Sequence, residues 1–544
     1  MKRIICSSAI IIIILGILTS CSAGHKSTLR LPASMQNLSF NEHLEISIGF
    51  WNIHDMVDNK EKDAILEDIE NAFNITIIPV SVSWENYKER YQIMSSTKSL
   101  PDIFATVTIS STSSNDSARL LTMIENRDIR PLPNDFSKFP RLRELFESMD
   151  YLRASDGNFY IIPRVAFTDP LLSFSDVGMV VRKDWMEALD MDAPESLDGF
   201  IELVGAFANN DPDRNGLDDT IGYNVNNRAA LGKWLILGIA PQCNIYSWIK
   251  TDEGYIPSYL TEDFKLVVSA YRRLYETGGL DPDFYTKKAT DAVDDFARGK
   301  LGALEYKVSP SAIMELESVW RLHQDKPFEE CVGLLEIFPA PDGKRYRNVS
   351  NLFWSETLIS ASVDDTKMER ILYLFDFLLS DEGYALTRYG REGVDYTIKE
   401  GEYHCLLEDI PEGNLVKTLE KKYPSLTLFP SLASWGGSKS DFEPNEINYL
   451  RYGKYATEIA YQSLLWNEQN TVPVERYFES LMIPKLPSDL FNTQAVLDDL
   501  TRIIIGKDDP VEMWEKQLEH YYREGIADYI RQQNELFSKY GNSR

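Results

Sequence analysis

The chain has 544 residues, of which 43% are hydrophobic and 26% are charged. This composition is that of a globular protein, and it excludes a disordered, collagen-like or coiled-coil chain. At about 100–200 residues per domain, the length predicts several compact units or a two-lobed body. The 56 Lys and Arg against 84 Asp and Glu give a net charge of −28, which argues against nucleic acid as a partner.

The first twenty residues have the pattern of a secretory signal peptide. Lys2 and Arg3 precede an apolar run over 10–18, which is shorter than the roughly 20 residues that span a bilayer. The sequence LTSC over 18–21 resembles the bacterial lipobox, which directs lipid addition to its cysteine. We therefore expect a lipidated Cys21 at the extracellular face of a bacterial cell membrane, with the lipid as the only contact with that membrane. A plain signal peptide is the alternative.

Residues 21–43 comprise this cysteine and a segment rich in Ser, Asn and small residues, whose lack of apolar periodicity predicts a flexible tether. Apart from Cys6 within the expected signal peptide, three further cysteines, Cys243, Cys331 and Cys405, are widely spaced and form no CxxC motif. This spacing indicates buried thiols rather than a disulfide framework or a zinc site, with a single disulfide as the alternative.

The folded part begins with alternating strands and helices. Residues 44–50 and 75–80 predict strands on either side of a helix over 60–73. A third strand over 100–105 follows a helix over 87–94. This order predicts an open, mostly parallel sheet, in which ligands bind beyond the carboxyl ends of the strands.

The rest of the chain is richer in helices. Strand character returns over 177–181 and 301–306, and a helix is predicted over 198–208. Further segments have periodic apolar positions with polar faces: 263–277, 289–298, 365–380, 450–466 and 509–537. The sequence therefore predicts two α/β lobes and a helical C-terminal mass.

Residues 211–220, DPDRNGLDDT, place oxygen ligands at positions 1, 3, 5 and 9 of a loop with glycine at position 6. This is the spacing of an EF-hand-type calcium loop, in which a backbone carbonyl at position 7 adds a ligand. Position 12 is Gly222, so the bidentate glutamate of a true EF-hand is missing. The alternative is a solvated turn, because Asp, Asn and Gly all favour turns.

Several segments together resemble the large lipid-anchored extracellular solute-binding proteins of bacterial ABC importers, in the carbohydrate-binding branch that includes alginate-binding proteins. These segments are 100–104, 180–185, 189–194, 198–200, 211–220, 278–284 and 296–303. The resemblance implies an α/β fold, a two-lobe clamp of the periplasmic-binding-protein type II kind with extra C-terminal helices. The expected division is 1–20 signal peptide, 21–43 lipidated cysteine and tether, 44–165 with about 300–360 as lobe 1, and about 166–299 with 361–544 as lobe 2.

In that family the DPDxNG loop is a structural calcium site. The resemblance thus implies Ca²⁺ held by the following groups: Asp211, Asp213, Asn215, the backbone carbonyl of Leu217, and Asp219. Thr220 stands where some members have a further acid.

The resemblance also implies a function, which is to capture a sugar or oligosaccharide by closing the lobes and to deliver it to the permease subunits of an ABC importer. We assign no catalytic residues, because the sequence has no GxSxG, HExxH or GxxxxGK[ST] motif, and we expect a monomer. The acidic charge favours neutral oligosaccharides over polyanions. Two alternatives stay open: a secreted carbohydrate-active enzyme, and a ligand-sensing or adhesion lipoprotein with the same clamp.

A sugar presents C–H faces and many hydroxyls, so its site should pair aromatic rings with polar side chains. The loops over 51–56 and 106–117 are expected at the binding edge of the first sheet. The aromatic candidates are Trp51, Trp234, Trp248, Tyr306, Trp354 and Trp435. For each of them, packing in the core is the alternative.

Overall fold

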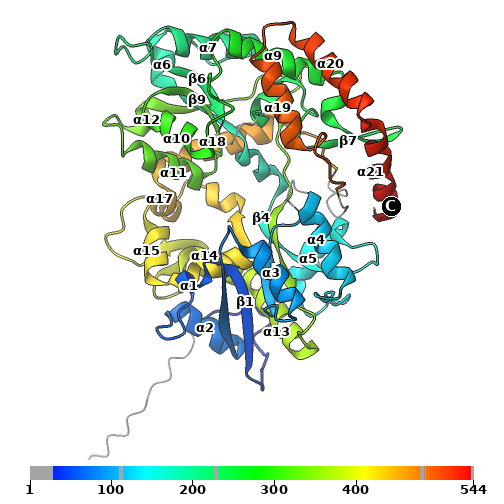
Figure 1. The fold of residues 1–544 in the computed structure, drawn as a ribbon. Coiled ribbons are helices and arrows are strands. Elements are labelled where there is room, and N and C mark those ends of the chain that lie inside the picture. The colour runs from blue at the N-terminus through cyan, green and yellow to red at the C-terminus, as the bar shows by residue number, and fades with distance from the viewer. Residues whose placement is uncertain (1–28, 110–113, 226–230, 478–482, 484, 541–544) are drawn as a thin grey trace, which may run out of the picture.

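Two β-sheets organise the chain into two lobes (Figure 1), in a computed structural model that describes residues 29–109, 114–225, 231–477, 483 and 485–540. The sheet of lobe 1 has the strand order β15-β4-β12-β3-β1-β2, and the sheet of lobe 2 has the order β10-β5-β9-β6. The expected signal peptide, Cys21 and residues 22–28 lie outside the described residues. No helix of the described part is long and apolar enough to cross a membrane.

Lobe 1 is built mainly from the first part of the chain and a later return. Its strands are β1 (Leu44–Trp51), β2 (Ile75–Val82), β3 (Ile103–Thr106), β4 (Ile161–Phe167), β12 (Phe353–Ile359) and β15 (Ser434–Gly437), with a separate hairpin of β13 (Tyr396–Lys399) and β14 (Glu402–Cys405). Its helices are α1 (Ile53–Met56), α2 (Ala64–Phe73), α3 (Tyr87–Ser96), α4 (Ser114–Glu125), α5 (Pro140–Ser148), α13 (Asp365–Leu378), α14 (Asp381–Tyr389), α15 (Leu415–Lys422) and α16 (Leu428–Leu432).

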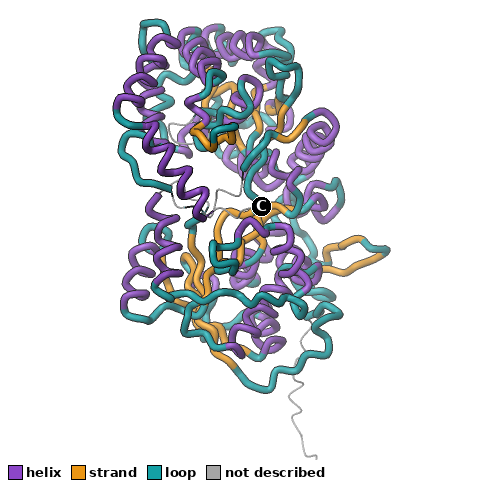
Figure 2. Tube along the Cα trace, turned by 90° about the vertical axis from the view of Figure 1, so that its right-hand side faces the viewer, coloured by secondary structure: helices purple, strands orange, loops and turns teal. Residues whose placement is uncertain are grey.

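Lobe 2 has a smaller sheet and more helices. Its strands are β5 (Gly178–Arg182), β6 (Ile221–Val225), β9 (Leu301–Tyr306) and β10 (Val332–Leu335), with a hairpin of β7 (Trp248–Thr251) and β8 (Gly254–Pro257). Its helices are α6 (Lys183–Ala188), α7 (Leu197–Asn209), α8 (Lys233–Ile239), α9 (Phe264–Glu276), α10 (Ala289–Ala297), α11 (Pro310–Trp320), α12 (Phe328–Cys331), α18 (Lys454–Asn470), α19 (Thr493–Ile504), α20 (Pro510–Arg523) and α21 (Ile526–Tyr540). Figure 2 shows the strands of each lobe among surrounding helices.

The first βαβ unit illustrates why these residues form these elements. Helix α2 begins at Asp63, whose carboxylate accepts hydrogen bonds from the backbone N–H groups of Ile65 and Leu66. It ends at Asn74, which adopts the left-handed conformation that helix ends favour. The apolar side chains of α2 that repeat at helical spacing are buried against the sheet, where β1 and β2 pair in parallel.

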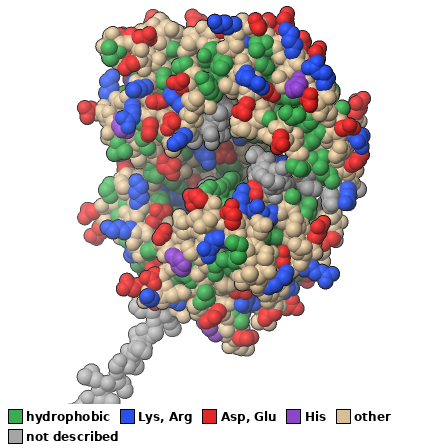
Figure 3. All heavy atoms as spheres, viewed as in Figure 1, with side chains coloured by type: hydrophobic (Ala, Val, Ile, Leu, Met, Phe, Trp, Pro, Cys, Tyr) green, Lys and Arg blue, Asp and Glu red, His purple; other side chains and the backbone are tan. Residues whose placement is uncertain are grey.

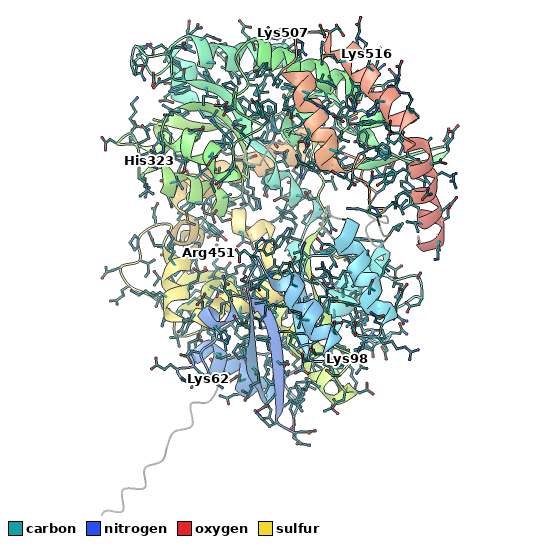
Figure 4. All side chains as sticks on the ribbon, in the orientation of Figure 1. Lys62, Lys98, His323, Arg451, Lys507 and Lys516 are labelled. Atoms are coloured by element: carbon teal, nitrogen blue, oxygen red, sulfur yellow. The ribbon has the colours of Figure 1, made fainter. Side chains whose placement is uncertain are left out.

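The described chain crosses between the lobes in three segments. They run from β4 to β5 through the 3₁₀ helix η2 (Pro170–Asp176), from β10 to β12 through the short strand β11 (Tyr346–Arg347), and from β15 to α18 through helix α17 (Glu446–Tyr452). The third segment contains a buried ion pair between Arg451 and Asp441. Arg451 is labelled in Figure 4, at the level where the two lobes meet.

These crossings differ from the expected lobe boundaries. Residues 301–335 lie in lobe 2, because β9 pairs with β5 and β6, and β10 pairs with β5. Residues 365–432 lie in lobe 1, where α13 and α16 contribute to the same core as β1. Strand pairing decides the first assignment and core packing the second, and both join segments far apart in the chain, which no local pattern in the sequence reports.

The expected tether differs from the structure as well. Residues 29–43 form a segment packed on lobe 1, which we call the N-terminal strap. Met35 in the strap is 2% exposed, and the guanidinium of Arg370 lies 3.9 Å from the centre of the Phe40 ring. Arg370 also donates to the backbone carbonyl of Glu42 (3.3 Å). The prediction of a flexible segment up to residue 43 was wrong because irregular chain without periodicity can still bury apolar side chains.

The three cysteines in the part of the chain that the structure describes are free thiols. Cys243 and Cys331 are buried, which confirms the prediction for them, and Cys405 is partly exposed. Burial raises the pKa of the Cys243 and Cys331 thiols to about 11.

Candidate functional site

The strand ends of the two sheets face each other at the junction of the lobes. Strand β12 is antiparallel to both β3 and β4, and β1 and β2 are parallel to β3, so the carboxyl ends of β1 to β4 lie at one edge of the sheet. Strand β4 leads directly into the first crossing segment. Strand β9 of lobe 2 ends at the same segment, where Val308 N–H donates to the Ser175 carbonyl (2.7 Å). Figure 3 shows the surface hollowed between the two lobes.

Three tryptophans from different strands meet at this edge of lobe 1. Trp51 ends β1, Trp84 follows β2, and Trp354 lies near the start of β12. The ring centre of Trp51 lies 5.1 Å from that of Trp84 and 6.1 Å from that of Trp354. The rings of Trp84 and Trp354 stack with their centres 5.5 Å apart. Trp51 is 8% exposed, whereas Trp84 is 47% and Trp354 37% exposed. We call these three residues the tryptophan platform.

A local irregularity of β12 places Trp354 on this platform. The register between β12 and β4 shifts between Phe353, which pairs with Val165, and Ser355, which pairs with Arg164. Trp354 is therefore the extra residue of a β-bulge. Bulges redirect a side chain relative to the regular strand, and they are common beside binding sites.

The buried guanidinium of Arg164 packs against two rings of the platform. The guanidinium of Arg164 lies 4.9 Å from the ring centre of Trp354 and 5.4 Å from that of Trp51. It is 5% exposed and donates to the carbonyl of Ser431 (3.1 Å). Burial lowers the pKa of Arg164 to about 10, and the nearby carboxylate of Glu356 opposes that shift. Cation–π contact of this kind fixes the orientation of the rings.

The carboxylate of Glu356 is wholly buried beside the platform. Its Oε1 accepts hydrogen bonds from the backbone N–H of Thr108 (2.5 Å) and from the Thr108 hydroxyl. Burial raises the pKa of Glu356 to about 7, although the Thr108 contacts and Arg164 favour the ionised form. Glu356 thereby ties β12 to the chain that continues beyond β3.

Lobe 2 has a comparable carboxylate at the end of β9. Glu305 accepts hydrogen bonds from the backbone N–H groups of Lys233 (2.8 Å) and Trp234 (3.0 Å), at the start of α8. The Tyr223 hydroxyl lies 3.5 Å from Oε2, the oxygen that also accepts from Trp234. Burial raises the pKa of Glu305 to about 7.

The remaining aromatic candidates lie in different surroundings. Trp234 is 4% exposed and packs on Phe338 and Phe200 in the core of lobe 2, and it borders a cavity of about 200 Å³ that the second crossing segment also lines. Trp248 packs on Phe537 of α21. Tyr306 is partly buried against the lobe 2 core, and burial raises its pKa to about 12. Trp435 belongs to β15, and its side chain lies outside the described residues.

The structure thus brings Trp51 and Trp354 together and places Trp234 and Trp248 in packed surroundings. Sequence reasoning missed Trp84, which is the most exposed member of the platform. The signal that could have found it is its position just after the second predicted strand, the same rule that selected Trp51 after the first.

The loop over 211–220 is folded around its own carboxylates. Asp211 accepts hydrogen bonds from the backbone N–H groups of Asn215 and Gly216 (both 3.0 Å), and the Asn215 amide donates to Asp213 (2.9 Å) and Asp219 (3.1 Å). Burial and the negative charges of Asp211 and Asp219 raise the pKa of Asp213. In the described residues, no group of three or more His, Cys, Asp or Glu side chains is arranged to hold a metal ion. The carboxylates of Asp211, Asp213 and Asp219, the Asn215 amide and the Leu217 carbonyl are nevertheless oxygen donors of the kind that Ca²⁺ prefers.

Comparisons with known proteins bear on this site and fold. No family model matches the chain. Lipoprotein LipO of Bacillus subtilis is 26% identical over 355 residues, which are 62% of this chain and 65% of that protein. The polygalacturonan/rhamnogalacturonan-binding protein YtcQ of the same organism is 22% identical over 487 residues, 88% of this chain and 89% of YtcQ. The fructooligosaccharide ABC transporter substrate-binding protein FusA of Streptococcus pneumoniae is 24% identical over about half of each chain.

Solved structures share the fold over nearly the whole chain. FusA of S. pneumoniae in complex with kestose superposes with a TM-score of 0.63 at 16% identity, over 92% of this chain and 99% of that one. The alginate-binding protein AlgQ2 without calcium ion gives a TM-score of 0.61 at 15% identity, with the same coverage. A further FusA structure is an EF-hand mutant.

The fold is therefore that of the substrate-binding proteins of ABC transporters, and the resemblance seen in the sequence is confirmed. Within that class, the relatives with curated names are a lipoprotein and two carbohydrate-binding proteins.

Proposed function

We propose that this chain is a lipid-anchored extracellular solute-binding protein that captures a sugar or oligosaccharide between its lobes and delivers it to the permease of an ABC importer. The observation that carries the proposal is the tryptophan platform at the lobe 1 edge that faces lobe 2. Trp84 and Trp354 present exposed ring surface there, while Trp51 and Arg164 hold them from below. The relatives YtcQ and FusA, which are named for binding carbohydrates, support the same class of ligand.

The chemistry of a sugar fits this arrangement. The C–H face of a pyranose or furanose ring stacks on an indole, and its hydroxyls exchange hydrogen bonds with nearby backbone and side-chain groups. A ligand that touches both lobes favours the closed arrangement over the open one, because it gains contacts only when the lobes approach. The three crossing segments are the places where the backbone would bend.

The chain is proposed to act as a monomer and to bind without chemical change. The named relatives are binding proteins, and the platform provides stacking rather than a pair of carboxylates at the separation that glycosidases use. Neutral oligosaccharides are favoured over polyanions because the whole chain carries a charge of −28.

The test is isothermal titration of the chain from Ser22 onward with kestose, an oligogalacturonide and neutral disaccharides, with product analysis after long incubation. Binding of one sugar class without turnover supports the proposal and identifies the ligand. Turnover would make the protein an enzyme. Failure of every sugar to bind, with the chain still folded, would contradict carbohydrate capture and favour the sensing or adhesion alternative.

Two further parts of the proposal concern the anchor and the ion. Cys21 is proposed as the lipidated residue, which places the protein at the extracellular face of the membrane, and the name of the relative LipO is consistent with this. Palmitate labelling of cells should be lost in Cys21→Ser.

The loop over 211–220 is proposed to bind a structural Ca²⁺ through its Asp and Asn side chains and the Leu217 carbonyl, since neutralising three neighbouring carboxylates removes their mutual repulsion.

A further inference from the structure

We infer that Glu356 in lobe 1 and Glu305 in lobe 2 are positioning residues for ligand binding, each holding the backbone of its own wall of the cleft through its ionised carboxylate. The inference rests on the proposed function and adds a regulation to the same site. Its consequence is that ligand affinity depends on pH near neutrality, even for an uncharged sugar.

Glu356 joins three parts of the lobe 1 wall. It lies opposite Thr106 in the pairing of β12 with β3, and it is two residues from Trp354 of the platform. Its Oε1 holds Thr108 through both the backbone N–H and the hydroxyl, and Thr108 is 2% exposed. The position of the chain that leaves β3 is thus fixed relative to the exposed ring of Trp354.

Glu305 performs the same task in lobe 2. Its two bonds from Lys233 and Trp234 fix the first turn of α8 to the end of β9. The backbone approaches so closely that a Cβ at Gly232 would lie 2.3 Å from the Glu305 carboxylate, so only glycine fits beside it. The indole of Trp234, which borders the cavity beside the second crossing segment, is set by this turn.

The two carboxylates have matching surroundings. Burial raises the pKa of each to about 7, which is unusual for glutamate and lies within the range of physiological pH. The charged or titratable groups that face Glu356 are Arg164 of β4 and Tyr87 of α3. Those that face Glu305 are Lys233 of α8, Tyr223 of β6, Tyr271 of α9, and Tyr246 in the chain between α8 and β7. The tyrosines have raised pKa values and stay neutral at this pH, so the two glutamates are the groups that change charge.

The direction of the effect follows from hydrogen-bond strength. An ionised carboxylate is a stronger acceptor of N–H and O–H groups than a protonated one. At pH 8 both glutamates are largely ionised and hold Thr108 and the start of α8 firmly. As the pH falls through 7 towards 6, they become protonated and these contacts weaken, so the walls of the cleft are less well organised for binding.

The first experiment needs no ligand. Amide hydrogen exchange is measured for peptides that cover 106–109 and 231–234 in the wild type, Glu356→Gln and Glu305→Gln, between pH 6 and 8 and corrected for the intrinsic rate. Gln keeps the shape of Glu and one acceptor oxygen, so the variants are expected to fold. We expect at least threefold faster exchange at 106–109 in E356Q and at 231–234 in E305Q at pH 8, each without effect on the other segment. Equal protection in variant and wild type would refute the inference.

The control is Glu420→Gln on α15, an exposed glutamate that lies outside both walls and makes none of these contacts. It should leave exchange at both segments unchanged. If E420Q changes them as much as E356Q does, the effect is a general loss of stability and the positioning role is wrong.

The second experiment measures affinity for kestose, or for the oligogalacturonide if the titrations select it, between pH 6 and 8. We expect severalfold weaker binding at pH 6 in the wild type and a nearly flat profile in the double variant E356Q/E305Q. A wild-type affinity that does not change with pH would overturn the regulation. If neither sugar binds, the proposed function fails, whereas the exchange experiment still decides whether the glutamates hold the two walls.

Discussion

The indole rings of Trp84 and Trp354 stack with their centres 5.5 Å apart and their planes 23° from parallel, although one residue follows β2 and the other is the second residue of β12. The pair is held by Trp51 and by the guanidinium of Arg164, both of which are buried. Contiguous exposed apolar surface of this kind is a feature of ligand-binding grooves and interaction sites rather than of ordinary solvated surface.

Removing one ring of the platform should weaken sugar binding with little loss of stability. We expect Trp84→Ala to raise the Kd for the bound sugar about tenfold, equivalent to ~1.4 kcal/mol, because the stacking surface is halved. Since Trp84 is 47% exposed, the Tm should change by no more than a few degrees. Titration calorimetry measures the first quantity and thermal unfolding the second.

Tyr522 on α20 provides the control for this variant, because it is an exposed aromatic residue in lobe 2 (57%) that belongs to the C-terminal helices. Tyr522→Ala should leave the Kd unchanged. Equal losses in W84A and Y522A would show that the platform has no special part in binding.

The buried ion pair in the third crossing segment should be important for stability. Replacing only Arg451 leaves the carboxylate of Asp441 buried without its cation, so Arg451→Met should destabilise the protein by about 3–5 kcal/mol. Urea unfolding of R451M against wild type measures this. The double variant R451M/D441L removes both charges and should recover part of the loss. A double variant as unstable as R451M would mean that packing rather than charge is responsible.

Glu356 should make stability depend on pH. Its pKa is about 7 in the folded chain and near 4.5 when unfolded, so the unfolded state loses its proton first as the pH rises. The folded state is therefore favoured most at low pH, and this contribution is lost progressively between pH 4.5 and 7. A shift of this size corresponds to about 3 kcal/mol.

In Glu356→Gln this dependence disappears. We expect E356Q to unfold at about the same urea concentration as the wild type at pH 4.5 and at a higher one at pH 8. Lower global stability of E356Q at pH 8 would contradict the prediction, because it would mean that the weakened contacts to Thr108 cost more than the removal of a buried charge gains.

Calcium should stabilise lobe 2 if the loop over 211–220 binds it. We expect millimolar CaCl₂ to raise the Tm of the wild type and EGTA to lower it, because an ion that binds only the folded state shifts the unfolding equilibrium. The variant Asp211→Asn/Asp213→Asn should lose the response, while Asp252→Asn, outside the loop, should keep it. A Tm that does not respond to CaCl₂ would favour the solvated turn.

Local elements could be predicted from the sequence because their signals are local. The predicted strand over 44–50 and helix over 60–73 correspond to β1 and α2, since alternation and helical spacing of apolar residues report burial on one face. The lobe to which β9 belongs could not be predicted in this way. It depends on pairing with β5, far away in the chain, and the Leu301–Tyr306 segment reads as a strand in either lobe.

The site could be predicted only in part for a related reason. Trp51 and Trp354 were both among the candidates, yet tryptophans are also common in cores, and Trp234 is one of these. The bulge that redirects Trp354 and the bonds from Thr108 to Glu356 are tertiary features without a sequence signature. The ligand role of every candidate stays a prediction until binding is measured.

If Cys21 carries a lipid, the N-terminal strap limits how far the folded body can lie from the membrane. Because residues 29–43 are fastened to lobe 1 by Met35, Phe40 and Arg370, only residues 21–28 remain between a lipid on Cys21 and the folded body. Eight residues span at most about 28 Å, roughly one bilayer thickness. A lipid on Cys21 would thus keep lobe 1 within that distance of the membrane surface. A solute bound between the lobes would then stay close to a transporter in the same membrane.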